Sequence, residues 1–383
     1  MPIGTFKNTL YGLALPLVGK RCEWKSADDP ELSRVLRKHH VVGACVQRFE
    51  KGVLTDCHAV GYASLEREKQ PVSQDTIFRT ASIAKMVSAL LVFRLQTLGR
   101  LNVQMEVTDL IGFPVRNPFF PDAPITLAML LSHTSSIVDS QAYFNAFQKQ
   151  TALSELLADE NAFAETLPGT AFRYSNFAAG IVGCILEKWT GKSLEELAGQ
   201  ELFEPLGVHA TFDASSLDAE RTADSYRVLP AAQAFSGCKR IASAKPLETP
   251  DPQQHYLLAS GNLYLTAADL AKLTLAAWNG ASGFLDQKSL QQMQKPLFGW
   301  PEKAVPMRHG MGLLQLEDPR VCAKTLWGHQ GFAYGAVNGV FFDAEGSGFV
   351  CLNSGASERR WGHLALINRD LIRWAFANEG SER

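Results

Sequence analysis

The feature that most constrains the fold of this chain is the position of its strand-like segments, which lie near both ends. Residues 41–49 and 53–61 are rich in β-branched side chains and are separated by a short turn, a pattern typical of a β-hairpin. Residues 339–343 and 348–353 are two further strand-like segments, and they flank a turn at residues 344–346. Between the two pairs, from residue 81 to about 305, the apolar spacing predicts helices joined by loops. We therefore predict one sheet built from both ends of the chain, with a helical block inserted between them.

Five segments carry clear helix signals. An Asp-Pro pair, which suits the N-cap and first position of a helix, precedes a surface helix over residues 31–40. Residues 81–98 are apolar on nearly every face, which predicts a buried central helix. Two more helices are expected over residues 177–189 and 267–280, and residues 361–377 are expected to form a closing helix.

The organisation of the chain is predicted to be a single unit over residues 1–383 of mixed α/β (α+β) class. Residues 1–80 and 306–383 are expected to form the α/β sheet part, and residues 81–305 the mostly helical part. A chain of 383 residues is long enough for one large buried core, and we find no internal repeat or hinge linker that divides it.

Charge and hydropathy restrict the partners of this protein. Lys and Arg total 37 against 39 Asp and Glu, and a formal net charge of −2 provides no field for nucleic acid or anionic membranes. No run reaches the roughly 18 apolar residues that a membrane span needs, so none is predicted. Residues 9–19 resemble a weak signal peptide, but Pro16 interrupts the run and Lys20 follows it. We expect a cytoplasmic protein, with export left open.

The seven cysteines show no pattern of a disulfide framework or a zinc site, since their number is odd and no C-x-x-C pair occurs. We expect reduced, mostly buried thiols and no bound metal. The seven are Cys22, Cys45, Cys57, Cys184, Cys238, Cys322 and Cys351.

Ser82 and Lys85 form an S-x-x-K pair at the start of the predicted central helix. A spacing of three places the hydroxyl and the amine on one helix face, and apolar surroundings disfavour the charged amine, so the amine can act as a base. About one such match is expected by chance in a chain of this length. Ser236 and Lys239 also match, but Gly and Cys lie between them and no helix is predicted to follow. We therefore favour Ser82 as the candidate nucleophile.

Tyr174 and Asn176 form a Y-x-N pair between a Pro-Gly turn and a predicted helix. A Tyr hydroxyl can move a proton, and a carboxamide can hold both a Lys and a substrate amide. Tyr143 and Asn145 have the same spacing inside an aromatic stretch, YFNAF, which is expected to form a helix face or the lip of a cleft.

His329 and Gly331 precede Phe332 where the chain enters its C-terminal strands. A glycine there allows the backbone to approach a ligand closely, and the following N–H could donate to an oxyanion. A lone His is more often structural, but its place after the other two motifs favours a site. The stretch 213–254 is rich in turn formers and could border the same cleft.

Taken in order, S-x-x-K, Y-x-N and H-x-G resemble the motifs of the serine β-lactamase and penicillin-binding-protein superfamily, in its class C, D-stereospecific peptidase and esterase branch. The resemblance covers about residues 30–376 and includes the similar framework segments at Thr126, residues 130–135 (LLSHTS), residues 204–207 (EPLG), Gly261, Leu263, Thr266 and Asp269. It implies a β-lactamase/DD-peptidase-like fold, in which an antiparallel sheet flanked by terminal helices adjoins a mostly helical subdomain.

The resemblance also implies a mechanism that needs no metal or organic cofactor. Ser82 would form an acyl-enzyme, while Lys85 and Tyr174 share the acid and base work. Asn176 would orient Lys85 and a substrate amide, and the backbone N–H groups of Ser82 and Phe332 would form an oxyanion hole. Gly331 and Tyr143 would contact the substrate. His329 would contact either the substrate or Tyr174.

Three departures from the family pattern affect the expected activity. Ser136 and Asn262 replace glycines, and His329 replaces the Lys of efficient β-lactamases. We therefore expect hydrolysis of a small ester or peptide-like amide rather than of a β-lactam. Acyl transfer from the same acyl-enzyme, or a catalytically silent penicillin- or ligand-binding protein, is the alternative. The oligomeric state stays open.

Overall fold

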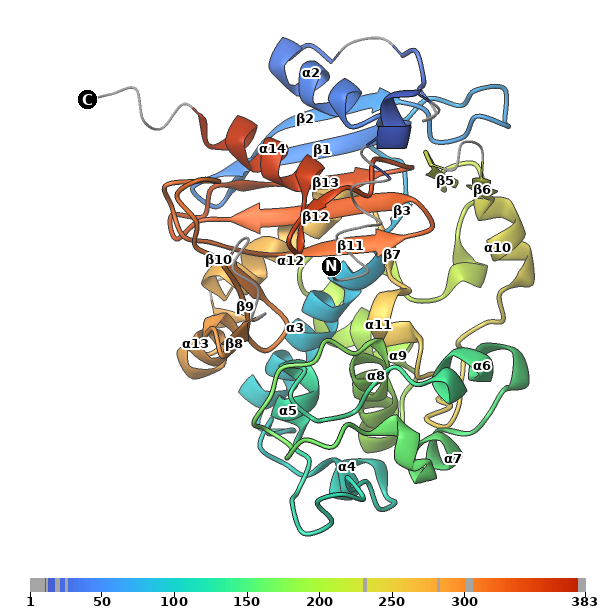
Figure 1. Cartoon of the computed structure of the whole chain (residues 1–383), viewed down its shortest axis with the longest axis vertical. Coiled ribbons are helices and arrows are strands. Elements are labelled where there is room, and N and C mark those ends of the chain that lie inside the picture. Colours follow the sequence, from blue (N-terminus) through green and yellow to red (C-terminus); the bar gives the residue numbers. More distant parts are fainter. Residues whose placement is uncertain are drawn as a thin grey trace.

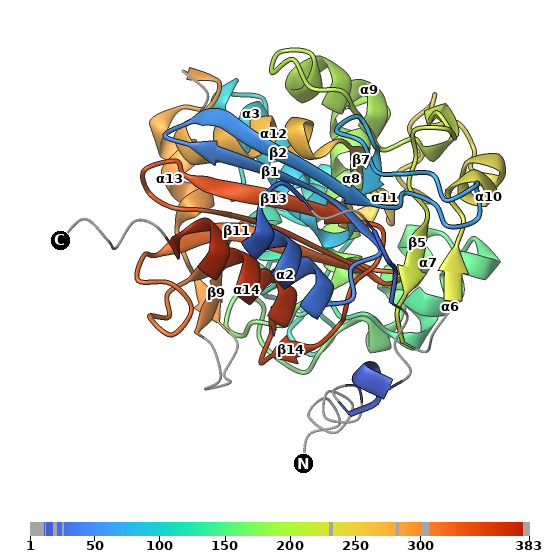
Figure 2. The same ribbon diagram turned by 90° about the horizontal axis from the view of Figure 1, so that it is seen from above.

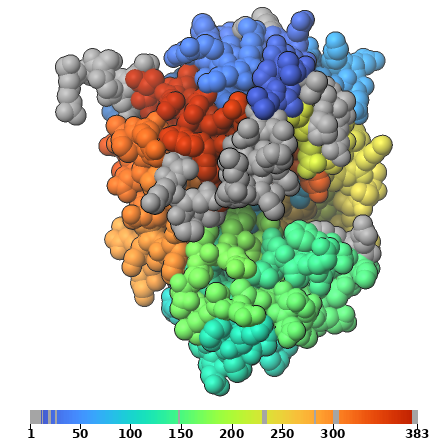
Figure 3. All heavy atoms as spheres, viewed as in Figure 1, coloured from blue at the N-terminus to red at the C-terminus, as the bar shows by residue number. Residues whose placement is uncertain are grey.

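The structure is a computed structural model that describes residues 11, 13–17, 21–24, 27–229, 233–280, 283–299 and 306–377. The signal-peptide-like segment 9–19 lies partly outside these residues, and so does the expected boundary at residue 305. Figure 1 shows the sheet part above the helical part, and the space-filling view in Figure 3 shows the same two parts stacked.

The main sheet is antiparallel and has eight strands in the order β2-β1-β13-β12-β11-β10-β9-β8. Its strands are β1 (Gly43–Glu50), β2 (Val53–Gly61), β8 (Phe298–Gly299), β9 (Met307–His309), β10 (Leu314–Leu316), β11 (Leu326–Ala333), β12 (Ala336–Phe342) and β13 (Gly348–Asn353). Strand β1 pairs with β13, with Ala44 opposite Asn353, so the two ends of the chain meet inside the sheet. The prediction of one sheet built from both ends is confirmed. Strand β8 belongs to this sheet although its residues were expected in the helical part.

Helices cover both faces of the main sheet (Figure 2). The terminal helices α2 (Pro30–Lys38) and α14 (Leu366–Ala375) lie on one face, and α12 (Ala267–Asn279) lies on the other. Side chains of β13 alternate between the faces as a strand requires. Phe349 and Cys351 pack in the core under α2 and α14, whereas Val350 and Leu352 pack in the core that includes α3.

The central helix α3 (Ala84–Thr97) is buried over most of its length, and every residue from Ala84 to Phe93 is buried. The first turn of the expected helix is a separate 3₁₀ turn, η1 (Ala81–Ile83). Helices α8 (Asn176–Thr190) and α12 end at Gly191 and Gly280, whose φ angles of 69° and 70° are left-handed, so their C-termini follow the glycine signals.

The remaining elements are short. The other helices are α4 (Val107–Ile111), α5 (Leu127–Leu131), α6 (Gln141–Lys149), α7 (Leu153–Ala158), α9 (Leu194–Ala198), α10 (Gly237–Ser243), α11 (Leu258–Gly261) and α13 (Gln287–Gln294), with single turns at η2 (Glu160–Ala162), η3 (Gly199–Phe203) and η4 (Ala214–Ser216). Small sheets are formed by β3 (Phe78–Arg79), β7 (Tyr264–Leu265) and β4 (Ala210–Thr211), by β5 (Ser225–Arg227) and β6 (Gln233–Phe235), and by β14 (Arg360–Trp361) and β15 (Leu364–Ala365).

Two local predictions differ from the structure. The closing helix begins at Leu366 rather than at residue 361, because the β14–β15 hairpin occupies the residues before it. Helix α10 follows Ser236, where no helix was expected, and Ser236 caps it by accepting a hydrogen bond from the Lys239 N–H. All seven cysteines are free thiols, of which three are buried and four partly exposed. Among the described helices, none combines the length and the apolar character required to cross a bilayer.

Candidate active site

Ser82 lies on the η1 turn, directly before the buried helix α3 and against strand β11. Residue 331 must be a glycine for this packing, because a Cβ there would lie 2.2 Å from the Thr80 carbonyl oxygen and 3.2 Å from the Ala81 Cβ. Gly331 therefore lets β11 pack closely on the turn that carries Ser82, whereas the expected close approach to a ligand stays a prediction. Ala81 adopts a left-handed φ of 55°, an uncommon conformation for a residue with a Cβ.

The Nζ atom of Lys85 lies between three oxygen atoms. It is 3.1 Å from Ser82 Oγ, 2.9 Å from Asn176 Oδ1 and 2.6 Å from the Ser260 carbonyl oxygen. A neutral amine has two N–H donors and one lone pair. Because an amide oxygen and a backbone carbonyl can only accept, they take the two N–H groups, and the lone pair is left for the Ser82 hydroxyl.

The surroundings of Lys85 favour this neutral form. Its side chain is 5% exposed, and burial lowers the pKa of Lys85 to about 7, with a further lowering by the charge of Arg79 and an opposing effect of Asp139. The space behind it is a cavity of about 10 Å³, close to the volume of a single water site and lined mainly by Leu130, Leu131 and other apolar side chains.

Asp139 holds the start of helix α8 and the Asn176 amide. Its Oδ1 accepts hydrogen bonds from Ser175 Oγ at 2.8 Å and from the Phe177 N–H at 2.9 Å. Its Oδ2 accepts one from Asn176 Nδ2 at 2.8 Å, so Asn176 Oδ1 is turned toward Lys85. The sequence analysis did not identify Asp139, since a single Asp after the HTSS segment matches no motif; its only signal is an acidic residue in that loop.

Tyr174 lies over Lys85 and beside Ser82. The Lys85 Nζ is 5.2 Å from the centroid of its ring, and its hydroxyl forms a side-chain hydrogen bond with Ser82. Burial raises the pKa of Tyr174 well above its usual value, so the resting hydroxyl is a neutral phenol. The ring of His133 packs against it, with centroids 4.4 Å apart.

His329 lies on β11 inside a group of neutral histidines. It is 3% exposed, and its Nδ1 is 2.7 Å from the Gln330 carbonyl oxygen, to which it donates. Burial lowers the pKa of His329 to about 3, and burial also lowers the pKa of His133 and of His309 far below the usual value. The rings of His309 and His329 have centroids 6.1 Å apart. The position expected to hold a Lys cation in β-lactamases is therefore uncharged.

Comparison with known proteins gives the same assignment as the motifs. Residues 29–371 match the protein-family model described as Beta-lactamase. The chain belongs to the beta-lactamase family. Esterase EstB of Burkholderia gladioli is 25% identical over 382 residues, which cover 90% of this chain and 94% of that protein. D-amino acid amidase of Ochrobactrum anthropi SV3, solved with D-phenylalanine, superposes with a TM-score of 0.70 at 23% identity, covering 91% of this chain and 98% of the amidase.

Other members of the family are longer than the matched region. Penicillin-binding protein 4 of Amycolatopsis lactamdurans is 30% identical over 174 residues, which make up 45% of each protein. The match therefore spans less than half of that relative.

The rival motif residues lie on two short helices, Lys239 on α10 and Tyr143 on α6. Ser236 caps α10, and the side chain of Lys239 is exposed rather than buried beside it. Tyr143 is 2% exposed, and its ring packs on Phe177 with centroids 4.8 Å apart. Of the two places expected for this stretch, a helix face or a cleft lip, the structure shows the helix face: α6 turns the Tyr143 ring into the core, and its burial gives no support to a substrate contact.

The two replaced glycines keep their local structure. Ser136 has a φ of 65°, the left-handed conformation that a glycine would favour, and Asn117 Nδ2 donates to its Oγ at 2.8 Å. Asn262 donates from Nδ2 to the Phe212 carbonyl oxygen at 3.0 Å. These departures therefore change side chains near the site without opening its framework.

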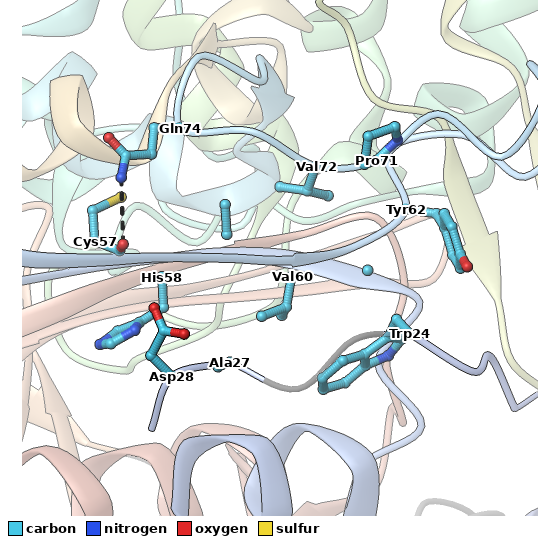
Figure 4. Close-up of a pocket in the computed structure, with 12 residues that line it drawn as sticks. Trp24, Ala27, Asp28, Cys57, His58, Val60, Tyr62, Pro71, Val72 and Gln74 are labelled. Carbon is cyan, nitrogen blue, oxygen red and sulfur yellow. Dashed lines mark hydrogen bonds between the residues drawn. The ribbon is translucent and has the colours of Figure 1, made fainter. Parts of the chain in front are cut away.

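A separate pocket of about 470 Å³ lies along the edge strand β2 (Figure 4). Its walls include Trp24, His58, Val60 and Tyr62, and none of its lining residues belongs to the Ser82 site. Among the described residues, no group of three or more His, Cys, Asp or Glu is placed to hold a metal ion.

Proposed function

We propose that this protein is a serine hydrolase that forms an acyl-enzyme on Ser82 and hydrolyses a small ester or a peptide-like amide. The observation that carries the proposal is the 3.1 Å contact between Ser82 Oγ and the Nζ of Lys85, an amine whose pKa is lowered to about 7 by burial. Such an amine is half deprotonated near neutral pH and can accept the hydroxyl proton.

The acylation step uses this pair. Ser82 Oγ forms a bond to the substrate carbonyl carbon while its proton moves to Lys85, and the carbonyl oxygen becomes an oxyanion. The backbone N–H groups of Ser82 and Phe332 are the proposed donors to that oxyanion. The bond from the carbonyl carbon to the leaving oxygen or nitrogen then breaks, and the leaving group takes a proton.

Tyr174 is the proposed carrier of that proton. Its neutral hydroxyl is hydrogen-bonded to Ser82 and its ring lies over Lys85, so a proton can pass from the lysine ammonium through the phenol to the leaving group. Water then attacks the acyl-enzyme carbonyl, the acid is released, and Ser82 regains its proton.

The substrate class follows from the charge of the site. His329 is neutral, so its side chain offers no cation to the carboxylate of a penicillin. Esters and amides that carry no carboxylate next to the scissile bond are the favoured substrates. The names of two similar proteins, an esterase and a D-amino acid amidase, describe the same two bond types.

Steady-state turnover tests the proposal. Purified protein is assayed with p-nitrophenyl acetate, D-alanine p-nitroanilide and nitrocefin, and Ser82→Ala is compared with Ser236→Ala as the matched serine control. We expect repeated turnover of an ester or anilide, a loss of about four to six orders of magnitude in Ser82→Ala, and no loss in the control. Release of at most one equivalent of product would instead identify a silent binder, and product that appears only with an added acceptor would identify an acyltransferase.

A further inference from the structure

Two arginines lie over the ring of one tyrosine just after strand β11, and a third lies over the phenylalanine that packs against it. The guanidinium carbons of Arg79 and Arg240 lie 5.1 Å and 5.5 Å from the centroid of the Tyr334 ring. The Phe235 ring packs against Tyr334 with centroids 4.8 Å apart, and Arg227 lies 5.7 Å from the centroid of Phe235. Figure 1 shows β5, β6 and α10, which carry three of these residues, beside the end of the sheet where β11 turns into β12.

The described side chains of this cluster carry mainly positive charge. Glu358 Oε1 lies 4.0 Å from Arg227 Nε, but within the described parts of the chain no ion pair joins Arg79 or Arg240 to an acid. Arg79 donates from Nε to the Gly261 carbonyl oxygen, which fixes its position. The charge of Arg79, with smaller contributions from the other two arginines, lowers the pKa of the Tyr334 phenol. The field at this point is therefore positive.

The cluster lies within reach of a substrate bound at Ser82. Tyr334 follows Phe332 by two residues, about 7 Å of extended chain. Arg79 precedes the η1 turn by two residues, and its charge contributes to the lowered pKa of Lys85. The cluster is open to solvent, since Tyr334 is 40% exposed and the Arg227 side chain 41%.

We propose that Arg79, Arg227 and Arg240, arranged around Tyr334, form a subsite for an anionic group of the substrate, a carboxylate or a phosphate, held away from the scissile bond. This inference rests on the proposed function, because it names the substrate class of the same Ser82 site. A guanidinium presents a planar set of N–H donors that fits either anion, and stacking on an aromatic ring holds that plane in place. The anion is thus recognised beyond Phe332 and not beside the neutral His329.

Two esters of equal chain length test the subsite. p-Nitrophenyl hexanoate ends in a methyl group, and mono-p-nitrophenyl adipate ends in a carboxylate at the same carbon. We expect kcat/KM to be about tenfold higher for the adipate ester at low salt, with the preference decreasing as salt is added. In Arg240→Gln the ratio of the two kcat/KM values should fall about tenfold. Arg34→Gln, on the far helix α2 with a 72% exposed side chain, is the matched control and should keep the wild-type ratio.

A binding measurement separates failure of the subsite from failure of the proposed function. Two proteins are titrated calorimetrically, the Ser82→Ala variant and the double variant that also carries Arg240→Gln. Each is titrated with adipate monoamide and, separately, with inorganic phosphate. Binding of either anion with an affinity that falls about tenfold in the double variant supports the subsite. The anion that binds with the higher affinity shows whether the subsite prefers a carboxylate or a phosphate. Equal kcat/KM values for the two esters, or no anion binding, would overturn the subsite while leaving ester hydrolysis intact. If the wild-type protein hydrolysed neither ester while Ser82→Ala still bound an anion, only the proposed function would be overturned.

Discussion

Asp139 Oδ2 lies 2.8 Å from Asn176 Nδ2, and this hydrogen bond decides which end of the Asn176 amide faces Lys85. A carboxylate can only accept, so it selects the NH₂ end of the amide. The oxygen end is then left 2.9 Å from Lys85 Nζ, where it takes one N–H and keeps the lysine lone pair directed at Ser82. Asp139 is a positioning residue, because it acts on the reacting atoms through Asn176.

Asp139→Asn should lower kcat by about 10- to 100-fold, since the Asn176 amide is no longer held in one orientation and a small misplacement is costly. The change also removes a negative charge that raises the pKa of Lys85. The pH at which kcat/KM is half-maximal should therefore move to lower values. Rate profiles from pH 5 to 9 measure both effects.

Asp122→Asn, at an exposed turn, is the matched control for this variant and should leave the profile unchanged. If Asp139 only stabilised the fold, Asp139→Asn would lower the melting temperature without moving the midpoint of the profile, and the positioning role would be rejected.

The wild-type pH profile follows from the charge state of Lys85. Its pKa of about 7 lies far below the usual value for a lysine, so the base is present above pH 7 and is lost by protonation as the pH falls through 7. We expect kcat/KM for p-nitrophenyl acetate to fall about tenfold for each pH unit below that midpoint. No second loss should appear up to about pH 10, because the pKa of Tyr174 is raised. A rate that stays constant from pH 5 to 7 would show that Lys85 is not the base.

Tyr174→Phe should reduce kcat/KM by about 10²- to 10⁴-fold, because it removes the hydroxyl that carries the proton and keeps the ring. Tyr143→Phe is the matched control. Its ring lies in the core, so loss of its hydroxyl should cost about 1 kcal/mol of stability with little effect on the chemical step. Parallel measurements of kcat/KM and of thermal unfolding check both variants, and equal rate losses would exclude Tyr174 as the specific carrier.

Gly331→Ala should displace β11 from the turn that holds Ser82. The new Cβ would lie 2.2 Å from the Thr80 carbonyl oxygen, and backbone atoms cannot yield as a flexible side chain does. We expect at least a tenfold loss of kcat/KM and about 1–3 kcal/mol lower stability in urea unfolding. Gly199→Ala, where no atom lies within 4 Å of the added Cβ, should show neither loss. A fully active Gly331→Ala protein would contradict the close packing described for β11.

The parts of the fold that the sequence predicts best are those controlled by neighbouring residues. Gly191 and Gly280 end their helices because only glycine readily adopts the left-handed conformation found there. Ser82 and Lys85 lie one helical turn apart, so their contact needs no distant residue. The hairpins at both chain ends were predicted for the same reason, since a turn between two β-branched segments is a local pattern.

The parts that sequence analysis missed depend on tertiary packing. Asp139 reaches Asn176 from a loop, and the Ser260 carbonyl reaches Lys85 from helix α11; both lie far from Lys85 in the chain, and no spacing rule connects them. The sequence leaves open whether Tyr143 lies on a helix face or at a cleft lip, because an aromatic run fits both, and only the orientation of α6 decides between them. The short strands β8 to β10 extend the sheet outward from the long strand β11, which pairs with β10, and their own two or three residues give little signal.

The central claim is that Ser82 is the residue acylated during turnover, and covalent labelling tests it most directly. The protein is treated with a serine-reactive fluorophosphonate, digested, and mapped by mass spectrometry, in parallel with Ser82→Ala. We predict one equivalent of adduct on the peptide that contains Ser82, loss of ester hydrolysis in proportion to labelling, and no adduct in Ser82→Ala. An adduct on Ser236, or full labelling of Ser82 with hydrolysis unchanged, would contradict the account.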